Sequence, residues 1–303
     1  MMRIVFMGTP DFARKPLERL YDDGHDIAGV FTQPDKPNSR GMAVRYSPVK
    51  ELAVAHGTPV FQPASLKHES VLDTLIGLNA ELIVVVAYGK ILTREILQIP
   101  PLGCINIHGS LLPKYRGAAP IQWAVLNGES ETGVTSMYIA EQLDAGDIIS
   151  TKKTPIGENE TAGELYNRLS VLSAELLSET VNAISRGEAA GTPQNHSLAT
   201  YAPQLTKEMS LIDWDDSANS IKNKVRGLNP WPVATMEING KTYKVFAVEN
   251  GRGGGAYSPG EIIGADTNGL EIACQGGSVI INEMQAPGGK RMSASDYLRG
   301  HRI

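Results

Sequence analysis

The sequence predicts an α/β protein: a Rossmann-like, mostly parallel sheet domain followed by a small C-terminal β-barrel of the OB-like kind. Two observations predict the first domain. Short apolar segments alternate with segments of helical apolar spacing, and one apolar segment, 82–87, is unbroken, as in strands buried on both faces. A third observation predicts the barrel, because the C-terminal part contains short strand-like segments separated by tight turns. We expect domains over 1–187 and 206–303, joined by a linker over 188–205.

Length and composition limit the class of protein. A chain of 303 residues can form two domains, each with its own core. Hydrophobic residues make up 42% and charged residues 20%, which excludes collagen-like and disordered chains. A net charge of −5 argues against a uniformly basic surface for nucleic acid. No apolar run is long enough to span a bilayer and no signal peptide pattern is present, so we expect a cytoplasmic protein without membrane contacts.

The first elements predict a βαβ unit. Residues 3–7 form an apolar strand, and a Gly-Thr-Pro turn follows, in which Thr9 can cap a helix and Pro10 suits its first turn. Helical spacing continues to Gly24, and 27–31 predict a second strand. The turn lacks the GxGxxG spacing of dinucleotide-binding proteins, so a plain tight turn is favoured.

A long loop interrupts the alternation of strands and helices. Between Thr32 and Ser47 the chain carries three cations and no apolar period, a length that is unusual unless the loop is functional or disordered. Beyond it the alternation resumes, and a capping-box pattern at Thr161 and Glu164 starts a helix that continues to Gly187. The predicted elements between these points are helices over 48–57, 69–78 and 118–126, and strands over 60–61, 82–87, 104–107 and 134–139.

The C-terminal part changes period. The segment 188–205 is rich in Ala, Gly, Thr, Pro and Asn without periodicity, which is typical of a linker. Ser217 can cap a short helix, and Asn239-Gly240 is a hairpin signal between two strands. The predicted strands are 234–238, 242–248, 261–263, 270–273 and 279–282.

The candidate chemistry lies where the strand 104–107 ends. Asn106 could donate to a developing oxyanion, and His108 could polarise a carbonyl or move a proton near neutral pH. Asp144, in a Leu-Asp-Ala-Gly-Asp segment, could orient the imidazole. Taken alone, strand-end hydrogen bonds and a polar turn explain these residues equally well.

Other common catalytic arrangements are not supported. Ser110 follows His108 closely but lies in no GxSxG elbow, so no serine nucleophile is indicated. The remaining histidines lack ligand spacing, and Cys104 and Cys274 are isolated, so we expect no metal site and no disulfide.

As a set, the motifs resemble a known family. Asn-Ile-His-Gly-Ser-Leu-Leu-Pro at 106–113 with the following Arg-Gly, and Leu-Asp-x-Gly-Asp at 143–147, are similar to the formyltransferases that use 10-formyltetrahydrofolate. Within that superfamily the chain resembles the methionyl-tRNA formyltransferase family over nearly its whole length and in the family's motif order. The motifs that carry this closer resemblance lie at 8–13, 31–35, 47–50, 84–89 and 229–232.

The resemblance implies a reaction. The α-amine of initiator methionyl-tRNA would attack the formyl carbon of 10-formyltetrahydrofolate directly, giving N-formylmethionyl-tRNA and tetrahydrofolate for translation initiation. No metal and no covalent enzyme intermediate are implied, and the family suggests a monomer. Asn106, His108 and Asp144 match the catalytic residues of the family. Asn106 and His108 would stabilise the oxyanion, while Asp144 orients His108 and helps the amine lose its proton.

The resemblance also implies binding residues. The folate-contacting loop of the family matches Ser110, Leu111, Leu112 and Pro113. Arg40 matches an arginine of the family's tRNA-contacting loop, with Arg45 further along, but Met42 and Ala43 stand where many members have two lysines. Basic residues of the second domain could face phosphates: Lys222, Lys224, Lys241, Lys244, Lys290, Arg291, Arg299 and Arg302.

Three alternatives stay open. A formyltransferase acting on a sugar nucleotide or a purine precursor would keep the same Asn, His and Asp, although the purine-precursor enzymes lack such a C-terminal domain. A hydrolase that releases formate differs in that water attacks instead of an amine. A tRNA-binding module with an inactive catalytic domain is disfavoured because all three catalytic matches are present.

Overall fold

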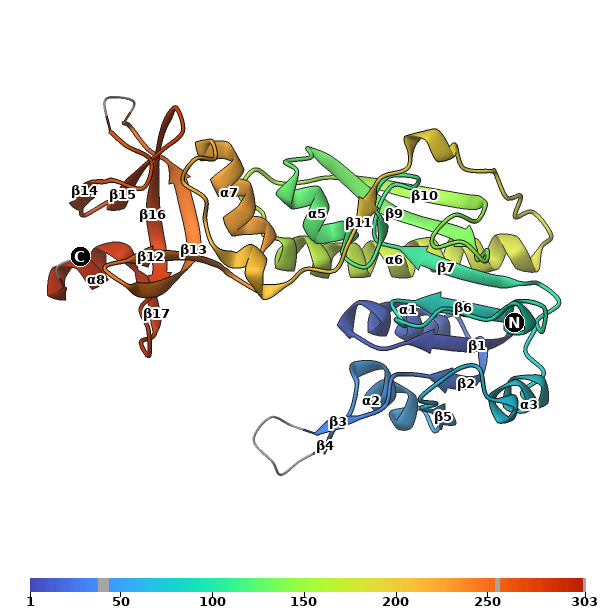
Figure 1. Ribbon diagram of the computed structural model, residues 1–303. Helices are drawn as coiled ribbons and strands as arrows, with labels where there is room; N and C mark the ends of the chain where they lie inside the picture. Colours follow the sequence, from blue (N-terminus) through green and yellow to red (C-terminus); the bar gives the residue numbers. More distant parts are fainter. Residues whose placement is uncertain (38–43, 254–256, 302–303) are drawn as a thin grey trace. The chain divides into compact units, whose positions relative to one another are not determined.

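The computed structural model describes residues 1–37, 44–253 and 257–301, and the chain forms two compact units (Figure 1). The first unit comprises residues 1–120, 131–155 and 166–202, and the second comprises 121–130, 156–165 and 203–303. Buried apolar side chains form a core in each unit. The domain boundaries expected from the sequence, 1–187 and 206–303, remain a prediction.

A seven-stranded sheet in the order β10-β9-β7-β6-β1-β2-β5 organises the first unit (Figure 1). The central strands and β5 run parallel, whereas β9 and β10 are antiparallel to their neighbours. The predicted mostly parallel sheet is therefore confirmed, with an antiparallel edge that the sequence did not indicate. The strands are β1 (Arg3–Gly8), β2 (Asp26–Phe31), β5 (Val60–Phe61), β6 (Leu82–Val86), β7 (Cys104–His108), β9 (Glu131–Tyr138) and β10 (Ile148–Pro155).

Sequence patterns account for the main elements around this sheet. Every residue of β6 is buried, as its unbroken apolar run requires. The capping box is present: Thr161 N donates to Glu164 Oε2 at 2.8 Å, and Glu164 N donates to Thr161 Oγ1 at 3.2 Å. The helices within the first unit are α1 (Asp11–Asp22), α2 (Pro48–Ala55), α3 (Glu69–Gly77) and α4 (Arg94–Leu97). Almost all of α5 (Pro120–Leu126) belongs to the second unit, and α6 (Ala162–Ser185) begins in the second unit and continues in the first.

The loop after β2 contains a short ladder. β3 (Lys36–Pro37) pairs antiparallel with β4 (Val44–Arg45). Ahead of β3, Asp35 forms an ion pair with Lys50 of α2 and accepts a hydrogen bond from Gln62 Nε2 at 2.9 Å. The base of the loop is thus fixed to the first unit. Of the loop residues named above, Arg40, Met42 and Ala43 lie outside the described residues, and Arg45 is described through its backbone in β4.

The second unit contains an antiparallel sheet in the order β12-β13-β16-β15-β14, with β17 also pairing with β16. Among the described residues β12 and β14 do not pair, so an antiparallel sheet domain is shown and the closed barrel is not. The elements are α7 (Ala218–Gly227), β12 (Ala234–Ile238), β13 (Lys241–Asn250), β14 (Ile262–Asp266), β15 (Gly269–Cys274), β16 (Gly277–Gln285), β17 (Arg291–Ser293) and α8 (Ala294–Gly300).

Two predicted local signals in this unit are confirmed. Asn239 and Gly240 have φ values of +51° and +71°, as a two-residue hairpin turn between β12 and β13 requires. Ser217 caps α7, accepting a hydrogen bond from Ser220 N at 3.2 Å. Neither β17 nor α8 was predicted from the sequence. Within the described ranges, no helix combines the length and apolarity needed to cross a bilayer.

A carboxylate in the second unit links stability to pH. Glu271 Oε1 accepts hydrogen bonds from Ser278 Oγ at 2.6 Å, Arg252 N at 2.9 Å and Gly253 N at 3.1 Å. The bond from Ser278 is the main cause that lowers the pKa of Glu271 below its ordinary value of 4.5. A lowered pKa stabilises the fold above the unfolded-state pKa, and this stabilisation is lost as the pH falls through the folded-state pKa.

We therefore expect Glu271→Gln to lower the midpoint of urea unfolding at neutral pH, because the amide oxygen is a weaker acceptor. The difference from the original protein should shrink as the pH falls from about 6 to about 3. Glu237→Gln, on the exposed side of β12, is the control and should leave the midpoint unchanged. An effect of Glu271→Gln that is independent of pH would contradict the assignment.

Candidate active site

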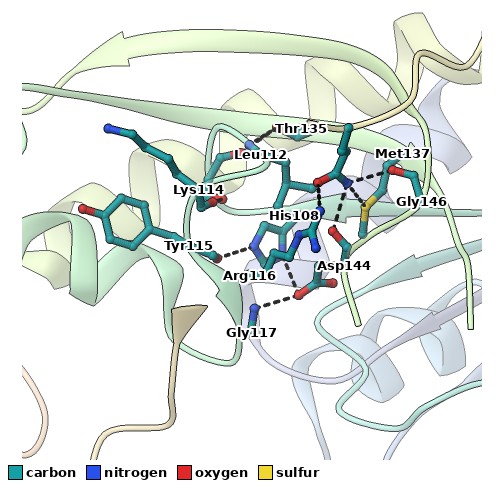
Figure 2. Close-up of polar contacts among 12 residues, drawn as sticks. His108, Leu112, Lys114, Tyr115, Arg116, Gly117, Thr135, Met137, Asp144 and Gly146 are labelled. Carbon is teal, nitrogen blue, oxygen red and sulfur yellow. Dashed lines mark hydrogen bonds and ion pairs between the residues drawn. The ribbon is translucent and has the colours of Figure 1, made fainter. Parts of the chain in front are cut away.

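His108 and Asp144 face one another at the carboxyl end of β7 (Figure 2). His108 Nδ1 lies 3.7 Å from Asp144 Oδ2, and the two side chains are 7% and 12% exposed. The other ring nitrogen of His108, Nε2, lies 2.9 Å from the carbonyl oxygen of Tyr115. Because a carbonyl oxygen only accepts, Nε2 carries a hydrogen. In the neutral ring Nδ1 is then the nitrogen that can take up a proton, and it faces the carboxylate.

Asp144 is held by backbone groups. Its Oδ2 accepts a hydrogen bond from Gly117 N at 2.8 Å (Figure 2). Asp144 has a φ of +48°, a left-handed conformation that Asp adopts more readily than most residues. Two residues later, a Cβ on Gly146 would lie 1.8 Å from the carbonyl oxygen of Tyr138, so this position requires glycine. The polar turn that the sequence suggested at 144–147 is therefore present, and it places the Asp144 carboxylate beside His108.

Asn106 lies two residues before His108 in β7, so both side chains project from the same face of the strand. The backbone of Asn106 pairs with Val85 of β6 and Met137 of β9. Its side chain is half-buried and makes no hydrogen bond within the described part of the chain. The carboxamide is thus available to a substrate. The structure brings His108 and Asp144 together directly and places Asn106 on the same strand face.

The loop that follows His108 is fixed to β9. Thr135 Oγ1 donates to the carbonyl oxygen of Ser110 at 2.6 Å. It also accepts a hydrogen bond from Leu112 N at 3.2 Å (Figure 2). The Ser110 hydroxyl donates to the carbonyl oxygen of Lys114 at 2.7 Å and is fully buried. The predicted folate-contacting residues Ser110 and Leu112 are buried, and Leu111 and Pro113 are half-buried. The bonds to Thr135 thus hold the loop against β9, and the bond from the Ser110 hydroxyl to the Lys114 carbonyl joins the two ends of the loop.

The segment expected to be a linker contributes to this site. Up to Ala202 it belongs to the first unit, and β11 (Tyr201–Ala202) pairs with β8 (Arg116–Gly117). A Cβ on Gly117 would lie 2.8 Å from the carbonyl oxygen of Ala202, which explains a glycine there. Thr200 Oγ1 also accepts from Tyr115 N at 2.9 Å, next to the carbonyl that holds His108.

Sequence reasoning missed Gln194 in this segment. Its Nε2 donates to the carbonyl oxygens of Asp144 at 2.9 Å and Gly146 at 2.7 Å, and its Oε1 accepts from Arg116 at 2.6 Å. No periodicity marks Gln194, since it lies in an irregular segment. Gln194 differs from a surface glutamine only in its burial among polar groups, since it is 6% exposed.

Other reactive groups are inert or dispersed. Burial raises the pKa of the Cys104 thiol to about 12, which keeps it protonated at neutral pH. In the part of the chain that is described, no three His, Cys, Asp or Glu side chains gather as metal ligands would. The arrangement can therefore donate hydrogen bonds from Asn106 and exchange a proton at His108 Nδ1 beside Asp144.

Comparisons with known proteins identify a family for this chain. Residues 2–181 match the formyl transferase family, and residues 204–302 match the formyl transferase C-terminal domain. Methionyl-tRNA formyltransferase of Geotalea uraniireducens (strain Rf4) is 47% identical over 302 residues, covering 100% of this chain and 96% of the relative. The enzyme of the same name from Alkaliphilus oremlandii (strain OhILAs) is 48% identical, covering 100% and 97%.

Solved structures show the same fold at low identity. An N-formyltransferase from Helicobacter canadensis, in complex with folinic acid and dTDP-3-aminofucose, superposes with a TM-score of 0.65 at 20% identity, covering 93% of this chain and 99% of its own. HypX from Aquifex aeolicus, in complex with tetrahydrofolic acid, superposes with a TM-score of 0.63 at 19% identity, covering 98% of this chain and 47% of its own.

The tautomer of His108 can be tested by two-bond ¹H–¹⁵N NMR correlation spectra. We expect Nε2 to be protonated and Nδ1 to show the shift of an unprotonated nitrogen. His56 is the matched control: its Nδ1 lies 3.0 Å from the carbonyl oxygen of Leu52, so it should be the opposite tautomer. Neutral His108 with its hydrogen on Nδ1 would contradict the geometry described for this site.

Proposed function

Because the chain belongs to the methionyl-tRNA formyltransferase family, we propose that it transfers the formyl group of 10-formyltetrahydrofolate to the α-amine of initiator methionyl-tRNA. The products are N-formylmethionyl-tRNA and tetrahydrofolate. The observation that carries the proposal is the pairing of His108 with Asp144 beside the fixed 110–113 loop. This pairing occurs in a chain that its named relatives match over the full length.

The attacking amine must be neutral. A free α-amino group titrates at about 7.7–8.0, and esterification of the neighbouring carboxyl lowers this further, so a reactive fraction exists at neutral pH. The amine nitrogen bonds to the formyl carbon to give a tetrahedral intermediate, and the bond from that carbon to the folate nitrogen then breaks. One proton leaves the amine and one proton is taken up by the departing nitrogen, so His108 needs only to carry a proton from the first nitrogen to the second.

Each residue has a distinct part in this proposal. Asn106 donates from its free carboxamide to the formyl oxygen as negative charge develops there. His108 takes the proton at Nδ1, because Nε2 is occupied by the Tyr115 carbonyl. The carboxylate of Asp144, 3.7 Å away, stabilises the imidazolium that results. The orienting bond to His108 comes from Tyr115, so the part of Asp144 is mainly electrostatic.

The donor is a substrate, and the family supports a formyl-tetrahydrofolate. The proposal assigns its contacts to Ser110, Leu111, Leu112 and Pro113. Their loop is held by hydrogen bonds and follows β7 directly, so a ligand in contact with it lies next to Asn106 and His108. Holding the two reactants in line supplies a large part of the acceleration in reactions without a covalent intermediate.

The tRNA contacts are proposed at two places. The first is the loop that carries Arg40 and Arg45, whose base is fixed by the Asp35 and Lys50 ion pair. The second is the sheet of the second unit, where Lys241, Lys244 and Lys290 are exposed. Other cations of the predicted basic surface are already paired: Lys222 with Glu158, Arg291 with Glu283 and Arg299 with Asp296. Arg302 lies outside the described residues.

We also expect the protein to be a monomer and to be located in the cytoplasm.

The proposal can be tested by incubating the protein with radiolabelled methionyl-tRNA and 10-formyltetrahydrofolate and measuring N-formylmethionine. Asp144→Asn should lower kcat by about 100-fold or more, since it removes the charge beside the imidazolium. Asp147→Asn, in the same turn but exposed, is the matched control and should retain the original rate. Absence of N-formylmethionine with the original protein, or formate release that is unaffected by tRNA, would contradict the proposal.

The loop assignment has its own test. Arg40→Ala should raise KM for methionyl-tRNA, because it removes a cation available to a phosphate, while the affinity for the folate stays the same. The control is Arg14→Ala on the exposed surface of α1, which should change neither. Equal loss of both affinities in Arg40→Ala would show that the loop does not contact tRNA selectively.

A further inference from the structure

We propose that Gln194 is a positioning residue for formyl transfer: it holds the turn that presents Asp144 to His108. This inference rests on the proposed function. The turn at 144–147 follows β9 and exposes Asp147. Two of its carbonyl oxygens, those of Asp144 and Gly146, accept hydrogen bonds from the same nitrogen, Nε2 of Gln194, at 2.9 and 2.7 Å.

The orientation of the Gln194 carboxamide is determined by its partners. The nitrogen offers two hydrogens, one for each carbonyl, and the oxygen accepts from Arg116 Nη2 at 2.6 Å. An inverted amide would place its oxygen against two carbonyl oxygens and its NH2 against a guanidinium, which only donates. The side chain can therefore satisfy this site in one orientation only.

Arg116 supports Gln194 from the other side, and Figure 2 shows it beside Asp144. Its side chain is buried at 4% exposure, and the same Nη2 approaches His196 Nδ1 at 3.1 Å. Since arginine only donates, that histidine nitrogen accepts. The backbone of Arg116 pairs with β11 as part of β8, so the residue that donates to the Gln194 oxygen belongs to a strand outside the turn that Gln194 holds.

The turn depends on such a contact because its own geometry is demanding. Asp144 adopts a left-handed φ of +48°, and Gly146 lies against the carbonyl of Tyr138. A displacement of about 1 Å in a catalytic group can cost about 100-fold in rate. Without Gln194 two carbonyl oxygens near the site lose their donor, and the turn must rearrange or admit water to satisfy them. The Asp144 carboxylate would then leave its place beside His108 Nδ1.

The test compares two variants with a control. Gln194→Met keeps the length of the side chain and removes the hydrogen bonds to Asp144, Gly146 and Arg116, together with the 3.9 Å contact from Nε2 to Met137 Sδ. Gln194→Glu keeps an acceptor for Arg116 and replaces the donor to the turn with an oxygen, so it remains informative if Gln194→Met does not fold. Asn195→Ala is the control, since the Asn195 side chain caps the 3-10 turn at 196–198 and its hydrogen bonds, among the described residues, come from Ser197. For each protein kcat, both KM values and the thermal unfolding midpoint are measured.

We expect both Gln194 variants to lose about 10- to 100-fold in kcat, with KM for tRNA and folate changed less than about threefold. The control should match the original protein. In an Asp144→Asn background the Gln194 substitutions should cost little further rate, because the group that they displace is already disabled. A purely structural role predicts instead a lower unfolding midpoint with unchanged kcat per folded molecule, or additive losses in the double variants, and either result overturns the proposal.

A second readout separates this inference from the proposed function. If the original protein forms no N-formylmethionine, the proposed function fails, but the ¹⁵N shift of His108 Nδ1 still reports the position of Asp144. Gln194→Met or Gln194→Glu should move that shift in the same direction as Asp144→Asn, and Asn195→Ala should not. An unmoved His108 shift in a folded Gln194 variant overturns the inference whatever the activity.

Discussion

The hydrogen bond from His108 Nε2 to the carbonyl of Tyr115 determines what the site can do. It assigns the hydrogen of the neutral ring to Nε2 and leaves Nδ1 facing Asp144. A general base needs a free lone pair near the proton that it takes, and a carboxylate nearby favours the charged ring that results. Much of the surrounding structure serves to place Tyr115 and Asp144 on the two sides of this ring.

Several segments of the chain between 104 and 202 supply that arrangement. β7 brings Asn106 and His108 to the carboxyl edge of a parallel sheet, where ligands bind in α/β folds. The loop 109–117 returns Tyr115 to the ring, and Thr135 of β9 fixes the loop. The turn at 144–147 and the segment 192–202 complete the site through Gln194. The antiparallel edge of the sheet matters here, because it brings Thr135 level with His108.

Patterns with a local physical cause could be predicted from the sequence. The buried strand, predicted over 82–87 and observed over 82–86, the capping box at Thr161 and the Asn239-Gly240 turn each depend on residues within a few positions of one another. The candidates His108 and Asp144 came from a motif in which neither residue was distinctive alone. Their proximity required coordinates, because 36 positions separate them in the chain.

Features that depend on long-range packing could not be predicted. Gln194 is a glutamine in an irregular segment, and only its burial against Asp144, Gly146 and Arg116 distinguishes it. The reversal of β9, which is antiparallel to both β7 and β10, follows from pairing across the sheet and cannot be recognised in an apolar strand pattern. The same holds for β17, a three-residue strand that depends on β16 as its partner.

The most direct test of the account is a crystal structure of the protein with a non-reactive formyl-tetrahydrofolate analogue bound. The account predicts the formyl oxygen within hydrogen-bond reach of the Asn106 carboxamide, at about 3 Å, with the formyl carbon on the Nδ1 side of His108. Binding of the analogue away from the 110–113 loop, or a formyl group remote from Asn106 and His108 Nδ1, would contradict it.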